Sequence, residues 1–66
     1  MKLKNIDLKA AQKNWEWDGR PYLVKYLGEV FVSHAKEING WKIYFDDVKN
    51  KRVVLLEHVE ELAVIQ

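Results

Sequence analysis

The stretch INGWKIYF at positions 38–45 constrains the fold of this chain more than any other part of its sequence. Asn-Gly between alternating apolar residues is the strongest local signal for a β-hairpin, because a type I′ turn needs two residues at positive φ. A two-residue turn at Asn39 and Gly40 places Glu37 opposite Lys42, and these opposite charges support that register. The stretch therefore predicts two antiparallel strands joined by a tight turn.

Side chains alternate between the two faces of a strand, so the same register predicts which residues point into the core. It places Trp41, Ile43 and Phe45 on one face, together with Val32 on the preceding strand. Lys36 falls on this apolar face as well. That position is tolerable at a sheet margin, where the ammonium reaches water, or if a β-bulge lies nearby.

Two further strands flank the hairpin. Residues 22–27 are aromatic, β-branched or aliphatic apart from Lys25, and Pro21 suits the first position of a strand. After the hairpin, a polar turn over 47–51, with Asn50 in the left-handed conformation, leads to the apolar strand RVVLLE at 52–57.

Both ends of the chain allow two interpretations. Residues 7–14 read as a helix with Asp7 as its N-cap, or as part of a strand that begins near Gln12. The C-terminal segment reads as a short helix, or as a single 3₁₀ turn over 57–61 followed by a last strand, LAVI.

Length and composition limit the architecture. Sixty-six residues form one small domain with a marginal core, and a chain without cysteine has neither disulfides nor thiolate metal ligands. Eight aromatic residues supply packing area instead. We expect residues 15–66 to form the β domain and residues 1–14 to form an N-terminal helix or arm.

The segment RVVLLEHVEELAVI at the C-terminus reads as a strand, one polar helical turn and a short closing strand. This order resembles the SH3-like small barrel, in which a single 3₁₀ turn joins the last two strands. The resemblance covers roughly residues 15–65 and implies a mainly β, antiparallel barrel of about five strands. It also implies binding rather than chemistry. Recognition of proline-rich peptides is not implied, because the chain lacks an ALYDY-like acidic stretch.

Catalytic and metal-binding constellations are weak. Ser33 and His34 are neighbours on a predicted strand and would point to opposite faces, so they form a poor nucleophile–base couple. His58 has no recognised ligand spacing with nearby glutamates, and Asp46-Asp47 diverge on their strand. We therefore expect a non-enzymatic protein with no cofactor, no metal and no small-molecule substrate.

Charge and aromatic residues concentrate in the first third of the chain. Residues 1–27 carry six cations against three anions, whereas residues 28–66 carry five cations against seven anions. Cations interleaved with aromatic rings suit nucleic acid, since cations neutralise phosphates and rings stack on bases. The candidate contact residues are Lys13, Trp15, Trp17, Arg20, Tyr22 and Lys25.

These observations give two functional hypotheses. The first is a DNA- or RNA-binding module that uses the basic, aromatic N-terminal surface. The second is a protein–protein interaction module, such as a small adaptor, inhibitor or regulatory subunit, with a homodimer as one form of this alternative. At least one of Trp15 and Trp17 is expected in the core, because a small domain needs its indoles for packing. The absence of long apolar runs predicts a cytoplasmic protein with no membrane partner.

Overall fold

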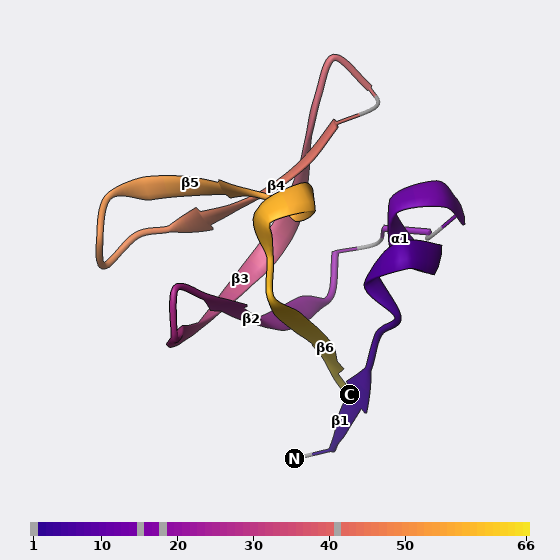
Figure 1. Ribbon diagram of the computed structural model, residues 1–66, viewed down its shortest axis with the longest axis horizontal. Helices are drawn as coiled ribbons and strands as arrows, with labels where there is room; N and C mark the ends of the chain where they lie inside the picture. Colours follow the sequence, from indigo (N-terminus) through magenta and orange to yellow (C-terminus); the bar gives the residue numbers. More distant parts are fainter. Residues whose placement is uncertain (1, 15, 18, 41) are drawn as a thin grey trace.

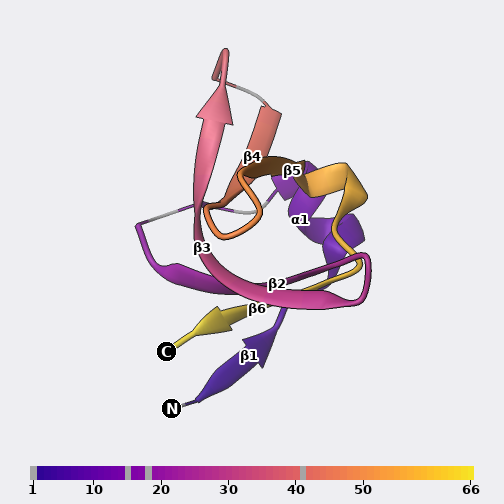
Figure 2. The same cartoon turned by 90° about the vertical axis from the view of Figure 1, so that its left-hand side faces the viewer.

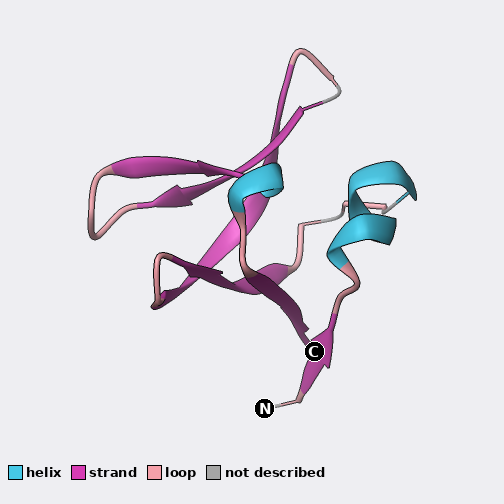
Figure 3. Ribbon diagram, in the orientation of Figure 1, coloured by secondary structure: helices cyan, strands magenta, loops and turns pink. Residues whose placement is uncertain are grey.

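The computed structural model describes residues 2–14, 16–17, 19–40 and 42–66, and it is mainly antiparallel β (Figures 1 and 3). In chain order its elements are β1 (Leu3–Asn5), α1 (Leu8–Asn14), β2 (Pro21–Tyr26), β3 (Glu29–Ile38), β4 (Lys42–Asp47), β5 (Arg52–Leu55), the 3₁₀ turn η1 (Leu56–His58) and β6 (Glu61–Ile65). The predicted fold class, a small mainly β domain with one short helix and a 3₁₀ turn, is confirmed.

The six strands form one sheet in the order β1-β6-β2-β3-β4-β5. The long strand β3 joins its two halves, since residues 29–34 pair with β2 and residues 35–38 pair with β4. Figure 2 shows how strongly β3 bends between these partners. A bent strand shared by two pairings folds the sheet over on itself, which is compatible with a small β-barrel.

The N-terminal helix forms because its first turn is capped. The Asp7 carboxylate accepts hydrogen bonds from the backbone N–H groups of Lys9, at 3.0 Å, and Ala10, at 3.4 Å. These groups have no partner inside a helix, so an N-cap oxygen stabilises its start. Ala11 points into the core and is buried. The helical interpretation of residues 7–14 is therefore confirmed, and the strand from Gln12 is not found.

A sixth strand, β1, was not predicted. Leu3 pairs with Ile65 and Asn5 pairs with Ala63, and the backbone N–H of Gln66 donates to Lys2 at 2.9 Å. The two ends of the chain thus lie side by side (Figure 1). Three residues without a turn signal are too few to show a period in the sequence.

The hairpin forms with a register one residue away from the predicted one. Ile38 pairs with Lys42, and Glu37 pairs with Ile43 rather than with Lys42. Asn39 and Gly40 do adopt positive φ, at 56° and 75°, but the connection is longer than a two-residue turn. The shift places Lys36 on the outer face.

The observed register also explains how the strand accommodates the charged side chain of Lys36 without a β-bulge. Lys36 lies opposite Tyr44 and pairs with the Asp46 carboxylate, on the face that points away from the core. Opposite charges on neighbouring strands stabilise a pairing, and an ammonium on this face keeps its contact with water. The two-residue register would instead have pointed Lys36 inward.

The core lies between the two halves of the sheet. Its most buried side chains are Tyr22 and Val24 from β2, Phe45 from β4 and Val54 from β5. Phe45 and Ile43 point inward as predicted. Val32 does not point inward: it lies on the outer face and is 59% exposed. The prediction for Trp41 lies outside the described residues.

The last two turns differ in detail from the prediction. In the turn between β4 and β5, Lys51 rather than Asn50 has positive φ, at 51°. The Asn50 side chain instead donates to the carboxylate of Asp47 at 2.9 Å. The alternative of one 3₁₀ turn followed by a strand is the observed one, but the turn begins at Leu56.

Candidate functional site

A groove lies between α1 and the tip of the β3–β4 hairpin. Its volume is about 550 Å³, and Lys13, Trp17, Glu37, Lys42 and Glu57 contribute to its lining. The Lys42 ammonium pairs with the Glu57 carboxylate at 3.5 Å. The structure therefore brings two of the predicted contact residues, Lys13 and Trp17, to one groove, and it adds two carboxylates that oppose phosphate binding.

Trp17 anchors this groove to the core. Its ring lies 5.4 Å from the Tyr22 ring and 6.0 Å from the Phe45 ring, between centroids. Tilted and edge-on arrangements at these distances are favourable for aromatic pairs. Trp17 is only half-buried, so one part of the indole packs against the core while another part remains accessible. Trp17 is thus a partly buried ring that packs against the core, which agrees in part with the expectation that at least one early indole belongs to it.

The other predicted contact residues are scattered. Tyr22 is 1% exposed, so its ring supports the core and does not reach the surface. Lys25 lies on the opposite side of β2 from Tyr22 and Val24, and its ammonium pairs with Glu61 at 3.3 Å. Arg20 is exposed just before β2, and Trp15 lies outside the described residues. The structure therefore does not gather the five described residues of this set into one surface.

A different surface stands out on the outer side of the sheet. Tyr22 and Val24 point inward, so the alternating positions of β2 point outward, and the strand registers give their neighbours on β1, β3 and β6. The apolar residues on this side, here called the outer apolar face, are Leu3, Leu23, Val30, Val32, Ala63 and Ile65.

The outer apolar face remains open to solvent. Val30 is 55% exposed, Val32 is 59% exposed and Leu3 is 46% exposed. Its central row runs across four strands, from Asn5 through Ala63 and Leu23 to Val32. The largest contiguous apolar patch on a folded monomer is often a functional surface.

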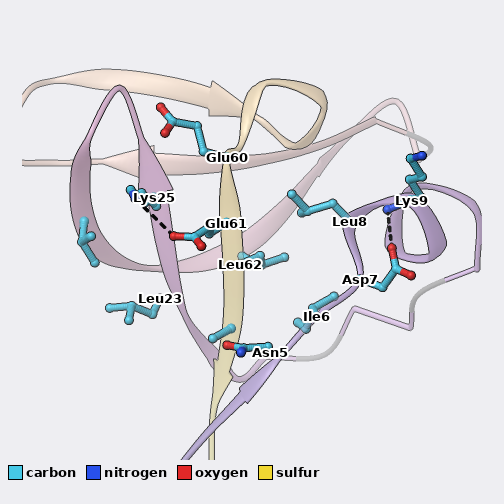
Figure 4. Close-up of a pocket in the computed structure, with 12 residues that line it drawn as sticks. Asn5, Ile6, Asp7, Leu8, Lys9, Leu23, Lys25, Glu60, Glu61 and Leu62 are labelled. Atoms are coloured by element: carbon cyan, nitrogen blue, oxygen red, sulfur yellow. Dashed lines mark hydrogen bonds and ion pairs between the residues drawn. The ribbon is translucent and has the colours of Figure 1, made fainter.

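A shallow groove of about 430 Å³ crosses this face (Figure 4). Leu23, Val30 and Ala63 line one part of it, and the groove continues past β6 to the start of α1 at Leu8. In Figure 4 the ion pair between Lys25 and Glu61 lies beside Leu23 and Leu62. The exposed lining is thus mostly apolar beside the Lys25–Glu61 ion pair, and Asp7, Lys9 and Glu60 add further charges to the lining.

A buried carboxylate closes one end of the core. Asp47 is 2% exposed, and its carboxylate accepts hydrogen bonds from the Asn50 side chain at 2.9 Å and the Arg52 guanidinium at 2.8 Å. These donors hold the pKa of Asp47 below its usual value, the Asn50 side chain most of all, although burial opposes them. Arg52 also pairs with Glu29 at 3.0 Å and lies over the Tyr26 ring. The contacts of Asp47 hold the β4–β5 turn, and those with Glu29 and Tyr26 join it to the β2–β3 turn, so the cluster is structural.

Chemically reactive constellations are few in the described part of the chain. There, no three His, Asp or Glu residues gather as metal ligands. Ser33 is buried on the inner side of β3, whereas His34 is exposed on the outer side, so the two do not form a nucleophile–base couple. None of the described helices has the length and apolar character needed to cross a membrane.

Comparisons of the chain with protein-family models, with curated proteins and with solved structures find no match. The choice of a candidate site therefore depends on the geometry alone. Sequence reasoning missed the outer apolar face, because it needs the partners of β6 and β1 to be known. The alternation of Leu23 with Tyr22 and Val24, and of Val30 and Val32 with Phe31, was the available signal.

Proposed function

We propose that this chain is a non-enzymatic protein–protein interaction module that binds another protein chain through its outer apolar face. The exposure of Val30 and Val32 on a four-stranded surface carries this proposal. Burying apolar surface is the main favourable contribution to most protein associations, at about 25 cal/mol per Å². Covering this face would remove β-branched side chains from water without leaving a charge unpaired, because Lys25 and Glu61 already neutralise each other.

The proposed barrel type is SH3-like, as the C-terminal pattern implies. The single 3₁₀ turn η1 between β5 and β6 supports this assignment, and so does the bend of β3 between two pairings. Such barrels serve many binding functions, so the fold supports a binding role by analogy only. The exposed apolar residues of the outer apolar face are what favour a protein partner.

A quantitative affinity purification tests the proposed function. The baits are the wild-type chain, Val32→Lys on the outer apolar face, and Val48→Lys as the matched control. Val48 is 83% exposed in the turn between β4 and β5, away from that face. We expect proteins that the wild-type and Val48→Lys baits enrich about equally and the Val32→Lys bait loses. If the Val32→Lys bait keeps every enriched protein, the outer apolar face is not the binding surface.

A second candidate function is nucleic-acid binding through the N-terminal lysines. Within the described residues, Lys2, Lys4, Lys9 and Lys13 form no ion pair, and they lie on or beside β1 and α1. Unpaired lysines can neutralise phosphates, and the accessible part of Trp17 lies in the same groove as Lys13. This role would involve a surface separate from the outer apolar face.

Salt-dependent titration of fluorescent single- and double-stranded oligonucleotides tests this candidate. The double variant Lys9→Ala/Lys13→Ala removes two charges from α1, and Lys49→Ala/Lys51→Ala removes the same number from the β4–β5 turn. Nucleic-acid binding by α1 predicts that affinity falls with salt, and that only the first variant weakens it and reduces the salt slope. Absence of binding at low salt excludes this candidate.

A further inference from the structure

We propose that Asn39 is a site of spontaneous deamidation, a covalent modification that places a carboxylate at the tip of the β3–β4 hairpin. This inference goes beyond the proposed function and does not depend on it. Gly40 follows Asn39 in the turn, and both residues are exposed. Asparagine deamidates fastest when glycine follows it, because a residue without Cβ does not hinder the backbone nitrogen that attacks the side chain.

The reaction needs only water as a second reactant. The backbone nitrogen of Gly40 attacks the side-chain Cγ of Asn39 and loses its proton to solvent. The bond between Cγ and the side-chain nitrogen breaks, ammonia leaves with a proton from solvent, and a five-membered succinimide ring remains. Water then adds to one ring carbonyl and opens the ring. Opening at one carbonyl gives aspartate, and opening at the other gives isoaspartate, in which the main chain runs through the side-chain carbons.

The structure leaves the reacting groups at Asn39 accessible. Among the described residues, neither the Gly40 backbone N–H nor the Asn39 side chain donates to a hydrogen-bond acceptor. A Cβ at Gly40 would meet no atom within 4 Å, so the space around this peptide group is open. The nitrogen therefore has no protein acceptor to give up before it turns toward the side chain.

Two other asparagines are held by hydrogen bonds and serve as internal comparisons. The backbone nitrogen that follows Asn50 donates to the carbonyl oxygen of Val48 at 3.3 Å, and the Asn50 side chain donates to the Asp47 carboxylate at 2.9 Å. The backbone nitrogen that follows Asn5 donates to the carbonyl oxygen of Leu62 at 2.9 Å. Ring closure at either place would break these bonds, and the residue that supplies the nitrogen carries a Cβ.

The products change both the groove beside α1 and the hairpin itself. Gly40 and Glu37 line that groove, so a carboxylate at the preceding position adds negative charge at its margin and lowers the formal net charge of +1 by one. Isoaspartate also lengthens the main chain by one carbon within a turn whose φ angles are 56° and 75°. That turn sets the pairing of Ile38 with Lys42, so the isoaspartate form should be less stable.

Peptide mapping of the aged full-length chain by mass spectrometry tests the proposal. The folded wild type is kept for days at mildly alkaline pH, which favours loss of the proton from nitrogen, and is digested before and after this period. Trypsin releases residues 37–42 with Asn39, and chymotrypsin releases residues 46–55 with Asn50. Residues 37–42 should gain the mass that replacement of –NH₂ by –OH adds. Asn39 should convert at least about tenfold faster than Asn50.

Gly40→Ala is the matched variant, because it keeps Asn39 and adds a Cβ to the residue that supplies the nitrogen. It should slow the conversion severalfold, whereas Gly19→Ala, the same change outside the hairpin, should leave the rate unchanged. If Gly40→Ala does not fold, as circular dichroism would show, it is compared with the wild type in urea. The effect of the glycine on the reaction should persist there.

The proposal is overturned if residues 37–42 keep their mass, if Asn50 converts as fast as Asn39, or if Gly40→Ala reacts at the wild-type rate. Asn39→Asp separates the two consequences of the reaction, since it carries the charge without the added backbone carbon. The aged wild type should melt at a lower temperature than Asn39→Asp. Equal melting temperatures would overturn the predicted effect of isoaspartate on the turn.

Discussion

Phe45 belongs to a cluster of three aromatic rings that pack against one another, with Trp17 and Tyr22. Its side chain is 0% exposed, and its ring lies 6.0 Å from both the Trp17 ring and the Tyr22 ring, between centroids. Because Trp17 also lines the groove beside α1, Phe45 links core packing to the position of that groove. Trp17, in the segment that precedes β2, thus packs against the rings of both Tyr22 and Phe45.

We predict that Phe45→Ala lowers the free energy of unfolding by about 3–5 kcal/mol, since it removes a buried aromatic side chain and leaves a cavity. Urea denaturation followed by Trp fluorescence measures this change. Val48→Ala is the control, because an 83% exposed side chain should change stability by less than about 0.5 kcal/mol. Similar losses in the two variants would show that Phe45 is not a core residue.

Asp47 gives the protein an acid-sensitive contact. Hydrogen bonds from Asn50, and then the Arg52 guanidinium, lower the pKa of Asp47 in the folded state. A carboxyl with a lowered pKa binds fewer protons folded than unfolded, so it stabilises the fold above the unfolded pKa of about 3.9. That stabilisation disappears as the pH falls through the folded pKa.

We predict that the wild-type melting temperature falls steeply below about pH 4 and that Asp47→Asn shows a flatter profile. Asp47→Asn should also be less stable than the wild type at pH 7, because the Arg52 guanidinium loses its buried partner. Asn50→Ala should flatten the profile in part, since it removes the strongest donor to the carboxylate. Thermal melts between pH 7 and 2.5 measure this. Equal acid sensitivity of the wild type and Asp47→Asn would assign the effect to another carboxyl.

At the scale of elements, the turn between β2 and β3 depends on Gly28. Its φ is +77°, and its preceding neighbour Leu27 also has a positive φ of 51°. Only glycine adopts this conformation without a steric cost from Cβ. The turn sets the pairing of Tyr26 with Glu29, from which the register of Leu23 and Val32 on the outer apolar face follows.

We predict that Gly28→Ala lowers the free energy of unfolding by about 1 kcal/mol or more, because alanine is strained at this φ. Gly19→Ala is a matched control. A Cβ at either position meets no atom within 4 Å, and only Gly28 has a positive φ. Chemical denaturation compares the two. Equal effects would mean that backbone conformation does not decide the cost at Gly28.

The hairpin and the helix show how far the sequence predicts the elements. Asp7, as a local cap, and Asn39 with Gly40, as local turn residues, are recognisable because their effect is confined to a few neighbours. The register of β3 against β4 is not local, since one added residue in the connection changes every pair. The ion pair of Lys36 with Asp46 is formed only in the observed register.

The candidate site was harder to predict, because it also depends on contacts between residues that lie far apart in the sequence. Trp17 and Lys13 come together in one groove because α1 packs beside the β3–β4 hairpin. Tyr22 and Lys25 separate because they lie on opposite sides of β2. The outer apolar face also needs β6 to lie between β1 and β2. Such pairings join residues from the two ends of the chain, and no local pattern specifies them.

At the scale of the whole molecule, stability and association should be coupled. A domain of this length buries only about 60% of the surface that its unfolded chain exposes. Its sheet leaves one apolar side uncovered at Val30 and Val32. A partner that covers this side would bind the folded state and not the unfolded chain, so it would raise the melting temperature by mass action.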